Sequence, residues 1–306
     1  MAAGGHGQKA VIAALVANAG IAVAKFVGFV VTGSASMLAE GVHSVADSGN
    51  QGLLLLGGKR AQKAATPRHP FGYGRERYFW SFVVAIVLFT LGAAFATYEG
   101  IKKIREPHEV ESLGVAIGIL VFGIVLEGFS LRTAVVESAK VKGDAGWWTF
   151  VRRSRSPELP VVLLEDCGAM AGLVIALAAV SISSATGDAV WDGYGTLTIG
   201  LLLGVIAVIL AIEMKSLLIG ESATDADQRA IQQAIETTPQ VSRLLHLRTQ
   251  HIGPDELLVG AKVEFAAALS MTELADAVNA LEQQVRAAVP VARILYIEPD
   301  VTRTDS

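Results

Sequence analysis

The stretch Ser36-Met-Leu-Ala-Glu-Gly-Val-His-Ser-Val-Ala-Asp-Ser-Gly-Asn-Gln51 lies between two apolar runs, 11–31 and 52–58, and decides how the chain must fold. At 3.6 residues per turn its polar side chains share one stripe of a helix: Glu40, His43, Asp47, Asn50 and Gln51. Each ionisable group at membrane depth costs about 2.5 kcal/mol or more, so the stripe must face something other than lipid. Because an imidazole and a carboxylate one turn apart can both bind one divalent transition metal, His43 and Asp47 predict a metal site within the membrane.

The composition places the whole chain in the membrane class. Its 306 residues are 52% hydrophobic and the mean hydropathy is +0.49, which is too apolar for an ordinary soluble domain of this length. We therefore expect a polytopic α-helical membrane protein with six spanning helices. The windows long enough to cross a bilayer are 10–32, 36–58, 78–100, 112–136, 159–183 and 191–218. The first window leads directly into the second without a small-residue cleavage site, so no removable signal peptide is expected.

Basic residues are concentrated in the loops after the second and fourth windows. These residues are Lys59, Arg60, Lys63, Arg68, Arg75, Arg77, Lys140, Lys142, Arg152, Arg153 and Arg155. The loops on the other side carry only Lys102, Lys103 and Arg105. Since short basic loops stay in the cytoplasm, both termini are expected there too.

The composition changes after Gly220. Residues 219–306 hold 13 Asp or Glu and 7 Lys or Arg, which predicts a soluble acidic domain 219–306 behind a membrane domain 1–218. Its pattern predicts a helix, two strands, a helix and a strand at 225–237, 243–250, 256–265, 271–288 and 293–298. Thr224 and Ser270, each with an acid three residues later, are typical of helix starts. This α-β-β-α-β order favours a small ferredoxin-like α+β fold.

Several function classes are not expected. The single cysteine, Cys167, excludes an intramolecular disulfide and a Cys-rich zinc finger. No Gly-rich phosphate loop of the Walker type occurs, which argues against direct ATP hydrolysis. We expect no enzymatic activity, no prosthetic group and no nucleic-acid partner.

Other polar residues fall within the apolar windows. Asn18 in the first window either supports the metal site from behind or bonds a neighbouring helix. Glu127, in the middle of the fourth, is a costly carboxylate that fits a proton path or a metal route. Glu40 on the metal stripe is a candidate for the same supporting or proton-carrying roles.

Three local signatures suggest a family. They are Gly33-Ser34-x-Ser36-x-Leu38-Ala39-Glu40-x-x-His43-Ser44-x-x-Asp47, then His69-Pro70-Phe71-Gly72-Tyr73-Gly74-Arg75-x-Arg77, and Asp166 in the fifth window. With six windows and a C-terminal soluble domain, the chain resembles the cation diffusion facilitator family, the proton-coupled exporters of zinc and related metals. The resemblance covers nearly the whole chain.

The resemblance implies a function and partners. His43, Asp47 and Asp166 are expected to bind a divalent ion, zinc above all, that leaves the cytoplasm in exchange for protons by alternating access. Nitrogen and oxygen donors also leave iron(II), cobalt and manganese open. A homodimer with a metallochaperone-like C-terminal domain is expected in a lipid bilayer, that of a bacterial plasma membrane.

The chain also departs from the family pattern. Val162 stands where the family's fifth helix offers a His or Asp, and Glu165 could turn inward to replace it, as a ligand or a proton carrier, or remain a surface acid. In the loop, Tyr73 replaces an imidazole ligand and Thr66 an acidic one, so its accessory site is expected to be lost. The C-terminal positions where zinc-binding members carry ligands hold Lys262, Tyr296 and Glu298, and the remaining imidazoles, His246 and His251, are displaced from the usual register.

Alternatives from other classes remain open at this point. His43 and Asp47 could simply bond neighbouring helices, and Asp166 could cap a helix or pair with a loop arginine. The protein could be a metal-gated membrane scaffold that recruits a partner without transport. An exporter of organic cations would use the same acids but would prefer an aromatic-lined cavity, and few aromatic residues lie near the stripe.

Overall fold

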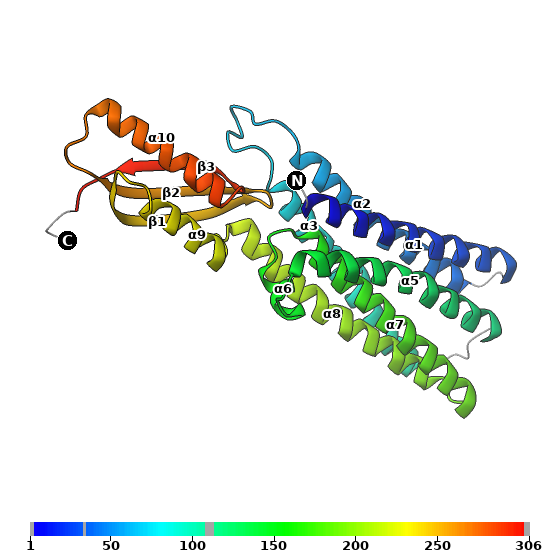
Figure 1. Cartoon of the computed structure of the whole chain (residues 1–306). Coiled ribbons are helices and arrows are strands. Elements are labelled where there is room, and N and C mark those ends of the chain that lie inside the picture. The colour runs from blue at the N-terminus through cyan, green and yellow to red at the C-terminus, as the bar shows by residue number, and fades with distance from the viewer. Residues whose placement is uncertain (1–2, 33–34, 108–112, 303–306) are drawn as a thin grey trace. The chain divides into compact units, whose positions relative to one another are not determined.

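Long apolar helices form most of the chain in the computed structural model (Figure 1). The structure describes residues 3–32, 35–107 and 113–302, and the side chains of 7–30, 44–45, 47–107 and 113–302. The helices before the sheet are α1 (Ala3–Thr32), α2 (Ala35–Ala61), α3 (Glu76–Val87), the π-helix η1 (Leu88–Ala94), α4 (Phe95–Arg105), α5 (Leu113–Lys142), α6 (Trp147–Arg153), α7 (Glu158–Thr186) and α8 (Val190–Ile219).

Five helical segments among the described residues are long and apolar enough to cross a membrane. They are Gly7–Val30, Glu76–Arg105, Leu113–Lys142, Glu158–Thr186 and Val190–Ile219. These segments coincide with five of the six predicted windows, and the protein is an integral membrane protein. The remaining window, 36–58, falls on α2, a helix of 27 residues.

The chain divides into two compact units. One consists of Met1–Arg60 and Arg77–Lys215, and the other of Ala61–Glu76 and Ser216–Ser306. The second unit therefore includes the connection between α2 and α3 as well as the acidic C-terminal region.

Close helix packing holds the first unit together. α1, α5 and α7 pack against one another. α4 and α8 approach so closely that a Cβ atom added at Gly100 would lie 2.7 Å from the Cα of Leu197, and one at Gly200 would lie 2.6 Å from the backbone nitrogen of Thr97. Small residues at such crossings let two helix backbones touch. The sequence did not indicate the π-helix that interrupts this third span.

The C-terminal part of the second unit follows the predicted order. Its elements are α9 (Asp225–Glu236), β1 (Val241–Gly253), β2 (Glu256–Phe265), α10 (Met271–Ala288) and β3 (Ala292–Pro299). The sheet order is β1-β2-β3, with β1 and β2 antiparallel and β2 and β3 parallel. α10 is the crossover between the two parallel strands, as a parallel pair requires.

The helix caps and the core explain this arrangement. The side chain of Thr224 accepts a hydrogen bond from the backbone of Asp227, and Ser270 forms a reciprocal capping box with Glu273, so both predicted helix starts are confirmed. The hydrogen bonds from Ser270 also lower the pKa of the Glu273 carboxyl. Apolar residues of both helices and the sheet form one core, which includes Ile231, Ile235, Leu257, Val259, Leu281 and Val285.

The connection between α2 and α3 packs on the hairpin of β1 and β2. A Cβ atom added at Gly74 would lie 2.9 Å from the carbonyl oxygen of Ile252 and 3.0 Å from the Cα of Gly253. The two backbones are therefore in direct contact, and only glycine fits at residue 74 without displacing the hairpin.

Candidate metal site

Two helices carry the predicted metal ligands. Asp47 lies near the middle of α2 and is half-buried, whereas the side chains of His43 and Glu40 lie outside the described residues. On the same helix Ser44 is buried and accepts a hydrogen bond of 3.0 Å from the Nζ atom of Lys25 in α1. Ser44 precedes Asp47 by about one helical turn. The amine of Lys25 therefore reaches from α1 to within about one turn of Asp47 on α2.

Asp166 lies inside the helix bundle. It is buried on α7, and one of its carboxylate oxygens accepts a hydrogen bond of 2.7 Å from the hydroxyl of Ser130 in α5. At 1.5 Å per residue it lies about 12 Å along α7 from Glu158, far from the cap of that helix. Ser130 was not singled out from the sequence, although it follows Glu127 by one helical turn.

Glu165 is turned into the protein rather than toward its surface. Its two carboxylate oxygens accept hydrogen bonds from the amide nitrogens of Asn50, at 2.9 Å, and Gln51, at 3.1 Å. The side chain of Asn18 in turn donates to the oxygen of Gln51 at 3.3 Å. Asn18 thus bonds a neighbouring helix, at a side chain that itself donates to Glu165. Val162, one turn before Asp166, is fully buried and apolar.

A further acid lies near the middle of α5. Glu127 is only 2% exposed. Its carboxyl group interacts electrostatically with three others, those of Asp166, Glu165 and Asp47. Four acidic groups that repel one another within a membrane need protons or a cation among them. This acid cluster, defined as Asp47, Glu127, Glu165 and Asp166, is the feature that any function must explain.

The acid cluster is not a complete metal centre by itself. Among the side chains that the structure describes, no three His, Cys, Asp or Glu residues lie close enough to hold one ion. The predicted imidazole ligand, His43, lies outside that set. Cys167 is exposed, which fits a residue without a role in ligation.

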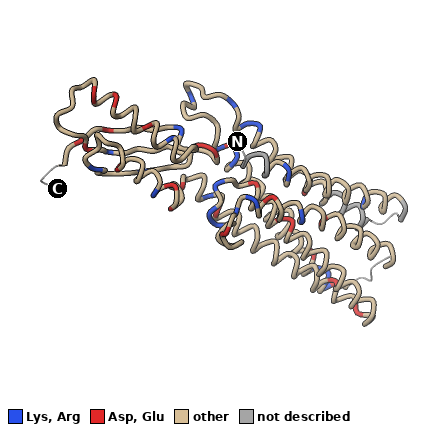
Figure 2. The backbone as a smooth tube through the Cα atoms, in the orientation of Figure 1, with Lys and Arg blue, Asp and Glu red and all other residues tan. Residues whose placement is uncertain are grey.

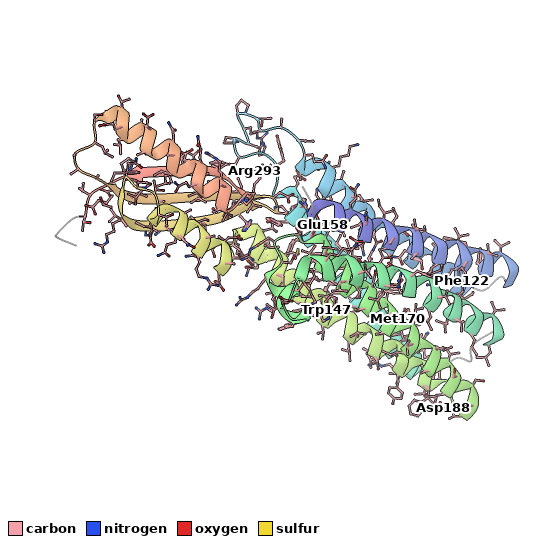
Figure 3. The ribbon with its side chains drawn as sticks, viewed as in Figure 1. Phe122, Trp147, Glu158, Met170, Asp188 and Arg293 are labelled. Atoms are coloured by element: carbon pink, nitrogen blue, oxygen red, sulfur yellow. The ribbon has the colours of Figure 1, made fainter. Side chains whose placement is uncertain are left out.

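Ion pairs join the helices at both ends of the bundle. They are Arg77–Glu158, Arg152–Glu213 and Lys103–Asp192. Glu158 begins α7 and Asp188 follows shortly after its end at Thr186, with Met170 between them (Figure 3). Arg77 binds both carboxylate oxygens of Glu158, one of them at 2.8 Å, and the two side chains are 10% and 8% exposed. Figure 2 shows that Lys and Arg gather at the end of the bundle where the N-terminus lies.

The loop residues that replace expected ligands hold the loop in shape. The hydroxyl groups of Thr66 and Tyr73 lie 3.3 Å apart, and the ring of His69 lies 4.7 Å from that of Tyr73. Backbone hydrogen bonds join Thr66 and His69 in both directions. These contacts give the three residues a structural role in this loop.

The corresponding C-terminal positions form ion pairs. Lys262 donates to Glu298 at 3.0 Å and to Asp300 at 3.2 Å, and these hydrogen bonds raise the pKa of the lysine. His246 is exposed and accepts a hydrogen bond from Arg248, whereas His251 is buried. An odd spacing along one strand places His246 and His251 on opposite faces.

Comparisons with known proteins place this geometry in context. Residues 11–219 match the model of a family described as the cation efflux transmembrane domain. The mitochondrial proton-coupled zinc antiporter SLC30A9 of Mus musculus is 34% identical over 84% of this chain and 46% of its own length. The metal tolerance protein C4 of Arabidopsis thaliana is 30% identical over 85% of this chain and 57% of its own length.

A third relative is of similar length to this chain. The magnetosome protein MamB of Paramagnetospirillum magneticum is 27% identical over 88% of this chain and 86% of its own length. The chain spans about half the length of the mouse antiporter and of the plant protein.

Proposed function

Because the chain belongs to the cation diffusion facilitator family, we propose that it exports a divalent metal ion, most simply zinc, in exchange for protons. The acid cluster within the helix bundle carries the proposal, since such a cluster is stable only when protons or a cation occupy it. A relative named as a proton-coupled zinc antiporter supports zinc as the ion. Export, rather than an enzymatic reaction, is the activity proposed, and the metal is cargo.

The proposed ligands come from the two central helices. His43 and Asp47 lie one turn apart on α2. Asp166 on α7 accepts a hydrogen bond from Ser130 on α5, which holds its carboxylate in place. Glu165 is proposed as the donor that replaces the one lost at Val162, because its carboxylate is buried beside Asp166 and held by two amides. With His43 these carboxylates would supply three oxygens and one imidazole nitrogen, a set that suits zinc, once the helices bring the three acids closer together than they lie in this structure.

Proton exchange follows from the chemistry of these donors. A metal ion binds the neutral imidazole and the ionised carboxylates, whereas protons bind the same atoms. Glu127 lies within electrostatic range of the other three acids of the cluster but belongs to α5, so we propose that it carries protons rather than metal. Glu40, on the metal-binding stripe of α2, is proposed for the same path.

Alternating access requires the two ends of the bundle to open in turn. The Arg77–Glu158 pair joins helices at one end of the bundle, and the Lys103–Asp192 pair joins helices at the other end. Breaking one pair while the other persists would expose the acid cluster to one side only.

The proposed topology has six spans, with α2 as the span that the hydropathy of the described residues does not identify. The basic loops support a cytoplasmic location for both termini, and we propose a bacterial plasma membrane as the location of the protein. We further propose a membrane domain of residues 1–218 and a cytoplasmic, ferredoxin-like domain of residues 219–306. The α-β-β-α-β order and the mixed three-stranded sheet support this fold.

The arrangement of helices and sheet in the C-terminal part of the second unit supports the proposal of a homodimer. Its two helices contribute to a single core with one side of the sheet, and the other side carries side chains such as the exposed Tyr296. A second copy of a two-layer unit can cover such a face with twofold symmetry.

Zinc-dependent proton movement tests the proposal. When zinc is added outside proteoliposomes that contain the purified protein and a trapped pH dye, the lumen should become more alkaline, because protons leave as zinc enters. Empty liposomes supply the baseline. A metal-gated scaffold predicts no flux, an organic-cation exporter predicts a response to organic cations but not to zinc, and either result would reject zinc–proton exchange.

The replacement for Val162 gives a second test. Glu165→Gln should weaken zinc affinity about as much as Asp166→Asn, because each removes one ionised donor. Val162→His should tighten zinc binding relative to manganese, because imidazole suits zinc better than a hard ion. Calorimetry on the folded protein measures both effects, with the exposed neighbour Cys167→Ser as the control. Unchanged zinc and manganese affinities in Glu165→Gln and in Val162→His would remove Glu165 from the ligand set.

A further inference from the structure

The amide of Asn50 is the feature of the bundle that the proposed ligand set does not explain. Its side chain is 2% exposed, and its nitrogen donates to a carboxylate oxygen of Glu165 at 2.9 Å. Its oxygen, Oδ1, is fully buried and has no hydrogen-bond partner among the residues that the structure describes. Burying a carbonyl oxygen without a hydrogen-bond partner costs about 1–3 kcal/mol of folding free energy. A ligand that binds this oxygen would offset that cost.

Asn50 lies on the same face of α2 as two of the proposed ligands. Asn50 follows Asp47 by three residues and His43 by seven, so the helix presents all three on one face. Its hydrogen-bond partner, Glu165, directly precedes Asp166 on α7 and interacts electrostatically with both Asp47 and Asp166. Asn50 thus provides one of the contacts between the two ligand-bearing helices.

The surrounding hydrogen bonds fix which way the amide points. Glu165 accepts from the nitrogen of Asn50, so the oxygen is directed away from that carboxylate. The opposite orientation would set two oxygens against each other and lose the hydrogen bond. Gln51 holds the second oxygen of Glu165, and Asn18 holds Gln51, so the carboxylate has little freedom to turn.

We propose that Oδ1 of Asn50 binds the transported ion directly, as a neutral oxygen donor beside His43, Asp47 and Asp166. The inference rests on the proposed function and deepens it. Added to the four proposed donors, which include Glu165, this oxygen raises the coordination number to five, and manganese(II) and iron(II) prefer a coordination number above four more than zinc does. Asn50 therefore widens the range of ions that the site accepts.

The test measures zinc and manganese affinity on the full-length protein in nanodiscs. Asn50→Leu removes the oxygen at nearly constant volume, and we expect manganese affinity to fall about tenfold or more, the scale seen when a group that supports a metal site is lost. Zinc affinity should fall less. Asn50→Asp retains an oxygen donor and should keep manganese binding.

Gln51 supplies matched controls, because it also donates an amide hydrogen to Glu165. Gln51→Leu and Gln51→Glu make the same chemical changes without removing Oδ1 of Asn50. If Asn50 acts only through its hydrogen bond to Glu165, the Leu variants should lose equal affinity and both acidic variants should bind poorly. That result would overturn the proposal.

Two further measurements separate the possible failures. If Asn50→Leu does not fold, the comparison of Asn50→Asp with Gln51→Glu decides alone, since equal loss rejects direct binding. Asp166→Ala in the same assay tests the proposed site itself. Retained affinity in Asp166→Ala rejects the site together with this inference, whereas lost affinity there with an unaffected Asn50→Leu rejects only the role of Asn50.

Discussion

Uptake of zinc into inside-out vesicles is expected to be abolished in each of three variants, His43→Ala, Asp47→Ala and Asp166→Ala. Each removes one of the donors that the proposed site offers to the ion. The Asp166→Ala substitution also removes the carboxylate that accepts the hydrogen bond from the hydroxyl of Ser130. The initial rate of zinc accumulation, normalised to the folded protein measured by size-exclusion chromatography, gives the effect.

Asp144→Ala is the matched control, because Asp144 is an exposed acid in the turn after α5. It should transport at the unmodified rate. Water can complete a coordination shell, so a partial loss in one of the three variants is compatible with the site. Uptake above half of the unmodified rate in any two of them would show that these residues are not the ligands.

The ion pair of Arg77 and Glu158 should have the largest effect on stability. Removing one partner of a buried, doubly hydrogen-bonded pair leaves an uncompensated charge, which costs about 3–5 kcal/mol. Arg77→Met or Glu158→Gln should therefore lower the melting temperature in detergent by roughly 6 °C or more, at about 2 °C per kcal/mol for a chain of this size.

Lys103→Met is the control within the same unit. Lys103 also pairs with an acid at a bundle end, but its side chain is 42% exposed, and exposed pairs contribute only about 0–1 kcal/mol. The double variant of Arg77→Met and Glu158→Gln should recover part of the loss, because no lone charge remains. Equal melting temperatures for Arg77→Met and Lys103→Met would contradict this account.

Local patterns predicted the elements of the C-terminal unit closely. β2 and α10 occupy the predicted ranges 256–265 and 271–288, because strand alternation and the cap at Ser270 are signals contained within a few residues. The windows of the long helices were equally visible, since about twenty apolar residues in succession have few other uses. The short helix α6 and the π-helix η1 carry no such signal and were missed.

The supporting contacts of the site were less accessible from sequence. The sequence pattern predicts a polar stripe on α2 and a ligand role for Asp166, but the hydrogen bond between Asn50 and Glu165 joins residues 115 positions apart. Its existence depends on how α2 and α7 face each other, which no pattern within one helix determines. The same holds for the pairing of Ser130 with Asp166, which joins two different helices.

The contact of Gly74 with the β1–β2 hairpin changes how the C-terminal unit is tethered. The chain crosses between the two units at 60–61, 76–77 and 215–216, so three covalent tethers join them instead of one. Each additional tether removes orientational entropy from a body that would swing freely on a single linker. Truncating the chain after Ile219 would also remove the hairpin on which loop 61–76 packs. To prepare the helix bundle alone, that loop must therefore be replaced by a short flexible linker as well.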